Sequence, residues 1–266
     1  MLSLLKQTLK NAALAVAPGA AVQLLAARAR THRHRYFERA GIRDRNRALQ
    51  AELGMTVLGG PFRGMRLPEE VAREQLGPYV LGSYESELHP VLESALAVGV
   101  TQVVDVGCCV GFYAVGLALR LPNIPVHAFD TDPWARTATR RAAELNGLRT
   151  VEVHGACTAQ WLESNLCPGA LVVSDCEGFE GDLLCAVPSG RLQRVTLLVE
   201  VHDDVVPGVE ARLACHLEGT HLLERVQFGG SPRDAFLPPH VPSAVPVQEL
   251  LLEHRAEQRW LVARPR

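Results

Sequence analysis

The sequence predicts an α/β fold built on an open, mostly parallel sheet. With 266 residues, 47% of them hydrophobic, the chain is long enough and apolar enough to bury a large core. From residue 100 onward, apolar runs of four to seven residues alternate with stretches of helical periodicity, which is typical of parallel strands joined by crossover helices. The helical stretches also carry start and stop signals at their ends.

Residues 1–54 are predicted to form an N-terminal helical extension. The segment 1–32 indicates two amphipathic helices, because Lys6 and Lys10 interrupt its apolar residues and Pro18 breaks it. It lacks the ~20 uninterrupted apolar residues of a membrane-spanning helix, and it fits a signal peptide poorly. We expect these helices to pack on a partner subunit in a homo-oligomer, with contact to a membrane surface as the less favoured alternative. The Arg- and His-rich stretch 28–47 is predicted to be a solvated helix face.

Residues 55–99 are predicted to lead into the core. Within 55–67, two short strands are expected to turn on Gly59 and Gly60. A helix, a loop at 77–83 and a second helix are expected to follow.

Residues 100–266 are predicted to hold the main domain. The expected strands are 102–106, 125–130, 150–154, 170–175, 195–202, 221–228 and 258–265, and the expected helices are 112–121, 133–145, 180–186 and 209–217. Helix 133–145 has the clearest ends, since Asp132 is a favourable N-cap and Gly147 is a stop signal. A loop at 229–246 with five prolines is expected to border a substrate cleft.

Composition narrows the class of partner and the compartment. Lys and Arg total 27 against 29 Asp and Glu, so no global positive field favours nucleic acid. The seven cysteines are odd in number and form no CxxC pair, which argues against a disulfide framework or a zinc knuckle. We therefore expect a cytoplasmic protein.

The residues that follow the first two core strands predict a cofactor site, because ligands of open α/β sheets bind beyond the carboxyl ends of the strands. The first strand ends in Asp105, followed by Gly107 and Gly111 in the pattern DxGxxxG. The second ends at Asp130, where a carboxylate can accept both hydroxyls of a ribose. An acid for an ammonium group and an acid for a ribose together indicate S-adenosylmethionine. The alternative is that both acids are helix caps or solvated strand ends.

Acidic residues also gather at the ends of the fourth and fifth strands. Asp175, Glu177 and Glu180 lie within six residues of one another, and Glu200 and His202 end the next strand. Carboxylates this close repel each other unless they share a proton or a cation, so this cluster is a second candidate site.

The segments DVGCCVGFYA, AFDTDP, SDCEGFEGDLL and VEVH together resemble the FkbM-type branch of the class I S-adenosylmethionine-dependent methyltransferases over about residues 80–204. The resemblance implies a Rossmann-like class I methyltransferase fold, in which a mostly parallel seven-stranded sheet has helices on both faces and an antiparallel C-terminal strand. GSYESEL resembles the family's approach segment, which places Tyr84 beside the cofactor. The implied cofactor-binding residues are Glu85, Asp105, Gly107, Cys108, Gly111, Tyr113, Asp130, Asp132, Ala156, Cys157 and Asp175. The chain departs from the family in having cysteines at 108 and 109, and Asp130 where Glu is usual.

The expected activity is O-methylation of a hydroxyl on a small molecule, with a sugar as the acceptor class that the family suggests. His202 is the preferred general base because imidazole titrates near neutral pH, and Asp175 is the alternative. With Glu177 they make up the catalytic candidates. Asp175, Glu177, Glu180 and His202 are also a candidate set of ligands for Mg²⁺ or Ca²⁺.

Three rival functions remain open from the sequence. A nicotinamide-dependent oxidoreductase is disfavoured because GxGxxG is missing. A non-catalytic binding protein of the same fold is disfavoured by the intact motif at Asp105 and Asp130. A metal-dependent enzyme would use the acidic cluster without methyl transfer.

Overall fold

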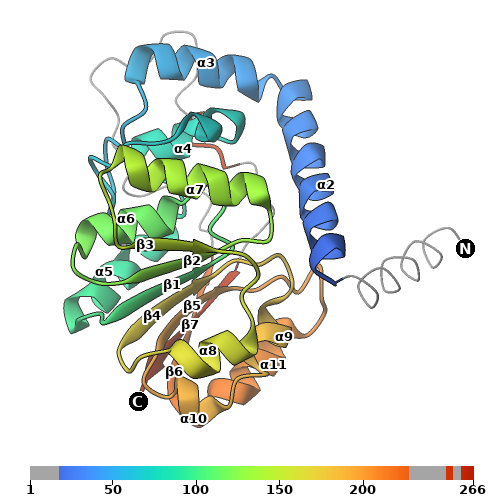
Figure 1. The fold of residues 1–266 in the computed structure, drawn as a ribbon, viewed down its shortest axis with the longest axis vertical. Coiled ribbons are helices and arrows are strands. Elements are labelled where there is room, and N and C mark those ends of the chain that lie inside the picture. The colour runs from blue at the N-terminus through green and yellow to red at the C-terminus, as the bar shows by residue number, and fades with distance from the viewer. Residues whose placement is uncertain (1–17, 228–249, 254–258) are drawn as a thin grey trace, which may run out of the picture.

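The computed structural model describes residues 18–227, 250–253 and 259–266. Its centre is a seven-stranded sheet of order β3-β2-β1-β4-β5-β7-β6 (Figure 1). The strands are β1 Gln102–Val106, β2 Val126–Phe129, β3 Val151–His154, β4 Ala170–Ser174, β5 Thr196–Glu200, β6 His221–Gln227 and β7 Arg259–Pro265. The pairs among β1 to β5 are parallel, while β7 runs antiparallel to β5 and to β6. This topology confirms the predicted Rossmann-like methyltransferase fold.

Helices cover both faces of the sheet, as predicted (Figure 1). One apolar core contains side chains of α5 His89–Val98, α6 Phe112–Arg120 and α7 Pro133–Leu145. The second core, on the opposite face, contains side chains of α8 Ala159–Asn165, α9 Glu180–Leu184, α10 Ser189–Leu192 and α11 Val209–Leu217. Successive residues of a strand point to opposite faces, so Val103 lies in the first core and Val104 in the second. Of these helices, α8 and α10 were not predicted.

The strand order reverses at β1, which pairs with β2 on one side and with β4 on the other. Such a switch point opens a crevice beyond the carboxyl ends of the strands. The register pairs Val106 with Ser174, so the loops that follow β1 and β4 start side by side.

The region before the sheet differs from its prediction. In place of two short strands, residues 55–67 form one antiparallel bridge, between Thr56 and Arg66, and backbone hydrogen bonds join Val57 to Met65 and Leu67 to Met55 on either side of it. The predicted loop at 77–83 contains most of a short helix, α4 Leu76–Leu81, preceded by the 3₁₀ turn η1 Glu69–Arg73. Gly77 permits close packing there, because a Cβ at this position would lie 2.2 Å from the carbonyl oxygen of Leu250. A second 3₁₀ turn, η2 Ser86–Leu88, leads into α5.

The N-terminal extension is helical where it is described, with α2 Pro18–Arg39 and α3 Ile42–Leu53. Pro18 is the first described residue of α2, so the break predicted at this position lies at the limit of the described residues. Among the described helices, none combines the length and the hydropathy needed to cross a membrane. The helix predicted before residue 18 and the proline-rich loop at 229–246 lie outside the described residues.

Candidate functional site

The loop after β1 turns sharply at Gly107. This residue has a φ of 90°, and a Cβ there would lie 1.6 Å from the carbonyl oxygen of Asp175. The amides of Gly107 and Cys108 donate hydrogen bonds to the carbonyl oxygen of Phe129, at 2.8 and 3.0 Å. The glycine therefore lets three strand ends, those of β1, β2 and β4, meet closely.

A pocket opens beyond this turn, and the open space inside it, counted out to solvent, is about 370 Å³. Six of the predicted cofactor residues line it: Glu85, Asp105, Gly107, Cys108, Tyr113 and Asp175. Tyr84, which was expected beside the cofactor, also lines it, together with residues that were not predicted there, namely Tyr79, Cys109, Val110, Phe112 and Val173. The pocket combines aromatic walls with buried acids, as small-molecule sites commonly do.

Asp105 lies at the floor of this pocket and is 3% exposed. Its carboxylate accepts a hydrogen bond of 2.9 Å from the amide of Ala114, in the first turn of α6. Burial raises the pKa of Asp105 to about 8, and the charges of Asp130, Asp175 and Glu85 add to this effect. Without a cationic ligand, Asp105 is thus largely protonated at neutral pH.

Glu85 forms a second buried acid on the pocket wall. Its φ of 50° is unusual for a residue with a side chain, and the hydroxyl of Tyr113 donates a hydrogen bond to its carboxylate. Tyr84 stacks on Tyr79 with ring centroids 4.3 Å apart, and both rings contact Phe112 edge-on. Tyr79 was not among the predicted site residues, because the sequence predicts a loop at 77–83 where the structure has α4.

Asp130 at the end of β2 joins two loops. One carboxylate oxygen accepts a hydrogen bond from the amide of Cys109 at 3.0 Å, and the other accepts one from the amide of Asp132 at 2.8 Å. Burial raises the pKa of Asp130 above its ordinary value. Each oxygen retains a lone pair for a further donor, which is what a ribose diol would need.

Asp132 has a different role from its neighbour. Its side chain caps α7 through the amide of Trp134, at 2.9 Å, and also pairs with Arg30 of α2. Like Asp130, it is absent from the pocket lining. The structure therefore uses the carboxylate of Asp132 to begin α7 and to hold α2.

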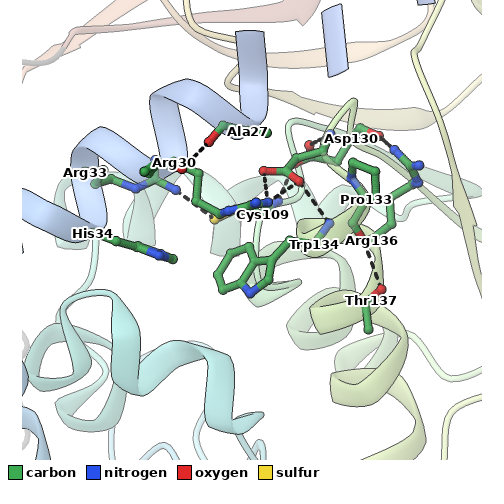
Figure 2. A network of polar contacts seen from close by, with 12 residues as sticks. Ala27, Arg30, Arg33, His34, Cys109, Asp130, Pro133, Trp134, Arg136 and Thr137 are labelled. Atoms are coloured by element: carbon green, nitrogen blue, oxygen red, sulfur yellow. Dashed lines mark hydrogen bonds and ion pairs between the residues drawn. The ribbon is translucent and has the colours of Figure 1, made fainter. Parts of the chain in front are cut away.

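Helix α2 docks on these strand ends through a polar network (Figure 2). Besides pairing with Asp132, Arg30 lies over the ring of Trp134, 5.5 Å from its centroid. Arg33 pairs with Glu74 at 3.0 Å, and its guanidinium lies 3.9 Å from the sulfur of Cys109. The prediction of a solvated face for 28–47 is therefore wrong for this part of α2. Residues three and four positions apart share one side of a helix, which turns these cations toward the domain.

The two cysteines of the glycine loop point in different directions. Cys108 is buried with its sulfur 3.3 Å from the hydroxyl of Thr139, and burial raises its pKa well above the ordinary value. Cys109 has a φ of 47° and faces Arg33. Gly111 has a φ of 81° and packs against Thr139. The thiol of Cys108 thus acts as core filler, and this residue can offer a ligand only its backbone.

The predicted contacts after β3 lie outside the pocket lining. Ala156 is exposed, whereas Cys157 is buried in the second core. The structure brings neither side chain to the acids at the pocket floor.

The acidic cluster surrounds His202, which has different neighbours on its two sides. Nδ1 lies 2.8 Å from Glu180, whose carboxylate also accepts hydrogen bonds from the amides of Cys176 and Gly178. Nε2 faces the acids Asp175, Glu177 and Glu200, at 3.7, 3.8 and 4.0 Å.

The pKa values in this cluster bear on the choice of base. Burial lowers the pKa of His202, but its hydrogen bond to Glu180 and the charges of Asp175 and Glu177 outweigh burial and raise it to about 9. Burial and the charge of Glu177 raise the pKa of Asp175 to about 7, although His202 opposes this shift. At neutral pH His202 is thus an imidazolium, and Asp175 titrates in the range that suits a general base.

The structure brings together a different set of potential metal ligands from the predicted one. Donor atoms of Asp175, Glu200 and His202 all lie within 4.8 Å of one another. Glu180 lies on the opposite side of the imidazole, and Glu177 is mostly exposed. The sequence prediction placed Glu200 beside this cluster but did not include it among the metal ligands.

No protein-family model matches the chain, and no curated protein matches it. Among solved structures, the chain is similar to a putative O-methyltransferase from Klebsiella pneumoniae, with 14% identity and a TM-score of 0.47 over 68% of this chain and 80% of that one. It is also similar to the O-methyltransferase TomG from Streptomyces achromogenes, with 14% identity and a TM-score of 0.46 over 68% and 79% of the two chains. A third similar structure is the methyltransferase domain of METTL16, with 12% identity and a TM-score of 0.47 over 85% and 96%. Likenesses this distant carry no argument about activity, and the FkbM resemblance stays a prediction.

Proposed function

We propose that this protein is an S-adenosylmethionine-dependent methyltransferase that methylates a hydroxyl of a small molecule, with sugars as the first acceptor class to test. The observation that carries the proposal is the pocket at the switch point of a methyltransferase fold, which is lined by Glu85, Asp105 and the backbone of Gly107. Ligands of open α/β sheets bind at this position.

The cofactor end of the pocket offers complementary charge. Asp105 and Glu85 are buried acids that gain from a cationic partner, and the ammonium group of the cofactor is such a partner. Asp130 is proposed to accept the ribose hydroxyls through its remaining lone pairs. The aromatic rings of Tyr84 and Phe112 exclude water from this end.

The acceptor end is proposed to lie between the pocket and His202. The cofactor supplies a sulfonium-bound methyl group when it is bound. Asp175 lines the pocket and lies 3.7 Å from His202, so it is positioned to take the proton of an acceptor hydroxyl. His202 is proposed to orient Asp175 and to offset its charge, because Glu180 fixes the imidazole through Nδ1. Much of the acceleration would then come from holding the acceptor in line with the methyl group.

A metal-dependent reaction is the second candidate, and the spacing of Asp175, Glu200 and His202 favours it. Two carboxylates and an imidazole suit a divalent ion that could bind an acceptor diol and lower its pKa. The raised pKa of His202 works against this candidate, since a proton competes with the ion for Nε2.

Calorimetric titration with S-adenosylhomocysteine tests the cofactor assignment, with NADH as the comparison ligand. We expect the adenosyl ligand to bind and Asp130→Ala to weaken it at least tenfold, because the variant removes the acceptor for the ribose hydroxyls. Asp204→Ala removes an exposed acid and serves as the matched control. Absence of heat with the adenosyl ligand in folded wild-type protein, or a clear preference for NADH, would refute the proposal.

We also expect affinity for S-adenosylhomocysteine to rise between pH 6 and pH 9. The ligand's ammonium group favours ionised Asp105, whose pKa is about 8 before binding, so binding displaces a proton below that pH. Titrations in buffers of different ionisation enthalpy measure this proton release. Asp105→Asn should remove most of the pH dependence, and a wild-type affinity that stays flat across this range would contradict the role of Asp105.

A further inference from the structure

A second group of potential ligands lies away from the pocket, on the two outermost parallel strands. His127 belongs to β2, and Glu152 and His154 belong to the edge strand β3. The register pairs His127 with Glu152, and His154 lies two residues further along β3. Because alternate residues of a strand point to the same face, all three side chains share the face that α8 covers.

The three donor atoms have the separations of metal ligands. Nδ1 of His127 lies 3.3 Å from Nε2 of His154, and Oε2 of Glu152 lies 3.6 and 3.7 Å from these two nitrogens. Bonds of about 2.0–2.1 Å from a tetrahedral zinc ion place neighbouring ligand atoms about 3.3–3.4 Å apart. The two distances to the carboxylate are too long for hydrogen bonds but fit the edges of a slightly expanded tetrahedron.

The surroundings also favour a ligand site over a chance cluster. β3 is the edge strand and none of its residues is fully buried, so what distinguishes this group is that two imidazoles and a carboxylate converge on one point. The ring of His154 stacks on Phe129 at 4.7 Å, and Trp161 of α8 contacts the ring of His127 edge-on at 5.1 Å. These contacts hold both imidazoles in place. The side chain of Glu152 is 63% exposed, which leaves an ion a path from solvent.

We propose that His127, Glu152 and His154 bind one divalent transition-metal ion, with Zn²⁺ as the best match to the ligands and their spacing. Imidazole nitrogen and carboxylate oxygen are common zinc ligands, and three protein ligands leave a fourth position for water. The ion would join the edge strand β3 to β2, next to the loop that starts at Gly155. The site is independent of the proposed methyl transfer, because neither His127 nor His154 lines the pocket.

Metal binding can be measured without any assay of activity. Full-length protein without a polyhistidine tag is stripped with a chelator and then titrated with Zn²⁺ by calorimetry, and with Co²⁺ to record the absorption of a tetrahedral site. We expect one equivalent to bind and the melting temperature to rise by about 5–10 °C when free Zn²⁺ is a hundredfold above its dissociation constant.

Single substitutions test which residues bind the ion. His154→Gln should abolish zinc binding, and Glu152→Gln should weaken it at least tenfold. Because Glu152 is exposed, Glu152→Gln leaves the fold intact. His32→Gln removes an exposed histidine elsewhere and should bind like wild type. His202→Gln tests the other cluster and should also bind like wild type. Absence of zinc binding in the wild type, unchanged binding in His154→Gln, or loss of the ion in His202→Gln would overturn the proposal.

Discussion

Gly107→Ala is expected to lower the free energy of unfolding by about 3 kcal/mol or more and to abolish binding of S-adenosylhomocysteine. The added Cβ would lie 1.6 Å from the carbonyl oxygen of Asp175, and the φ of 90° is one that residues with side chains rarely adopt. Relief of this contact requires the loops after β1 and β4 to separate, and the pocket lies between them. Urea unfolding and calorimetric titration measure the two effects.

Gly155→Ala is the matched control, because it makes the same change in the loop after another parallel strand. A Cβ at Gly155 would meet no atom within 4 Å, so we expect a change in stability of less than about 0.5 kcal/mol. If Gly107→Ala keeps wild-type stability and ligand affinity, the close approach of the loops after β1 and β4 is not needed for folding or for binding.

The stability of the protein is expected to depend on the protonation of His202. Its pKa is about 9 in the folded protein, compared with about 6.5 when unfolded. Because the folded state holds this proton more tightly, the stabilisation is complete below about pH 6.5 and is lost as the pH rises through 9. Its full size is about 3 kcal/mol, at about 1.4 kcal/mol for each pKa unit.

Urea unfolding of wild type and of His202→Gln at several pH values between 6 and 9.5 measures how much the protonation of His202 contributes to the free energy of unfolding. The wild type should exceed the variant most at pH 6, and we expect the difference to shrink by about 3 kcal/mol by pH 9.5. Taking the difference removes the contributions of Asp105 and of other groups that do not interact with His202. Asp175 does not cancel in this way, because His202 lowers its pKa and the variant removes that effect. His32→Gln changes an exposed histidine and should track the wild type throughout. A constant difference between wild type and His202→Gln would contradict the raised pKa.

Much of the fold was predictable because its signals are local. Helix α7 begins and ends where the sequence predicted, since Asp132 caps it and Pro133 fits its first turn. The five parallel strands follow from short apolar runs. The segment before the sheet was harder to predict, because Gly77 and Pro78 resemble loop residues but belong to α4, where Gly77 lies close to the backbone of Leu250.

The candidate site was predictable where its residues follow a strand directly. Asp105, Gly107 and Asp175 come immediately after apolar runs, and the carboxyl ends of parallel strands meet at one edge. The sequence could not tell which acids face His202. That choice depends on the register of β4 and β5, which pairs Ser174 with Val199 and so brings Asp175 beside Glu200.

The type of sheet, the glycine turn after β1 and the acids at the strand ends are predictable from the sequence, because each depends on residues a few positions apart. The pairing of Arg30 with Asp132, 102 positions away, and the contact of His127 with Glu152 and His154 arise only when the chain folds. The same holds for the side of His202 that each acid occupies. These contacts depend on strand register and helix docking, which arise from packing across the whole domain and leave no periodic signal in the chain.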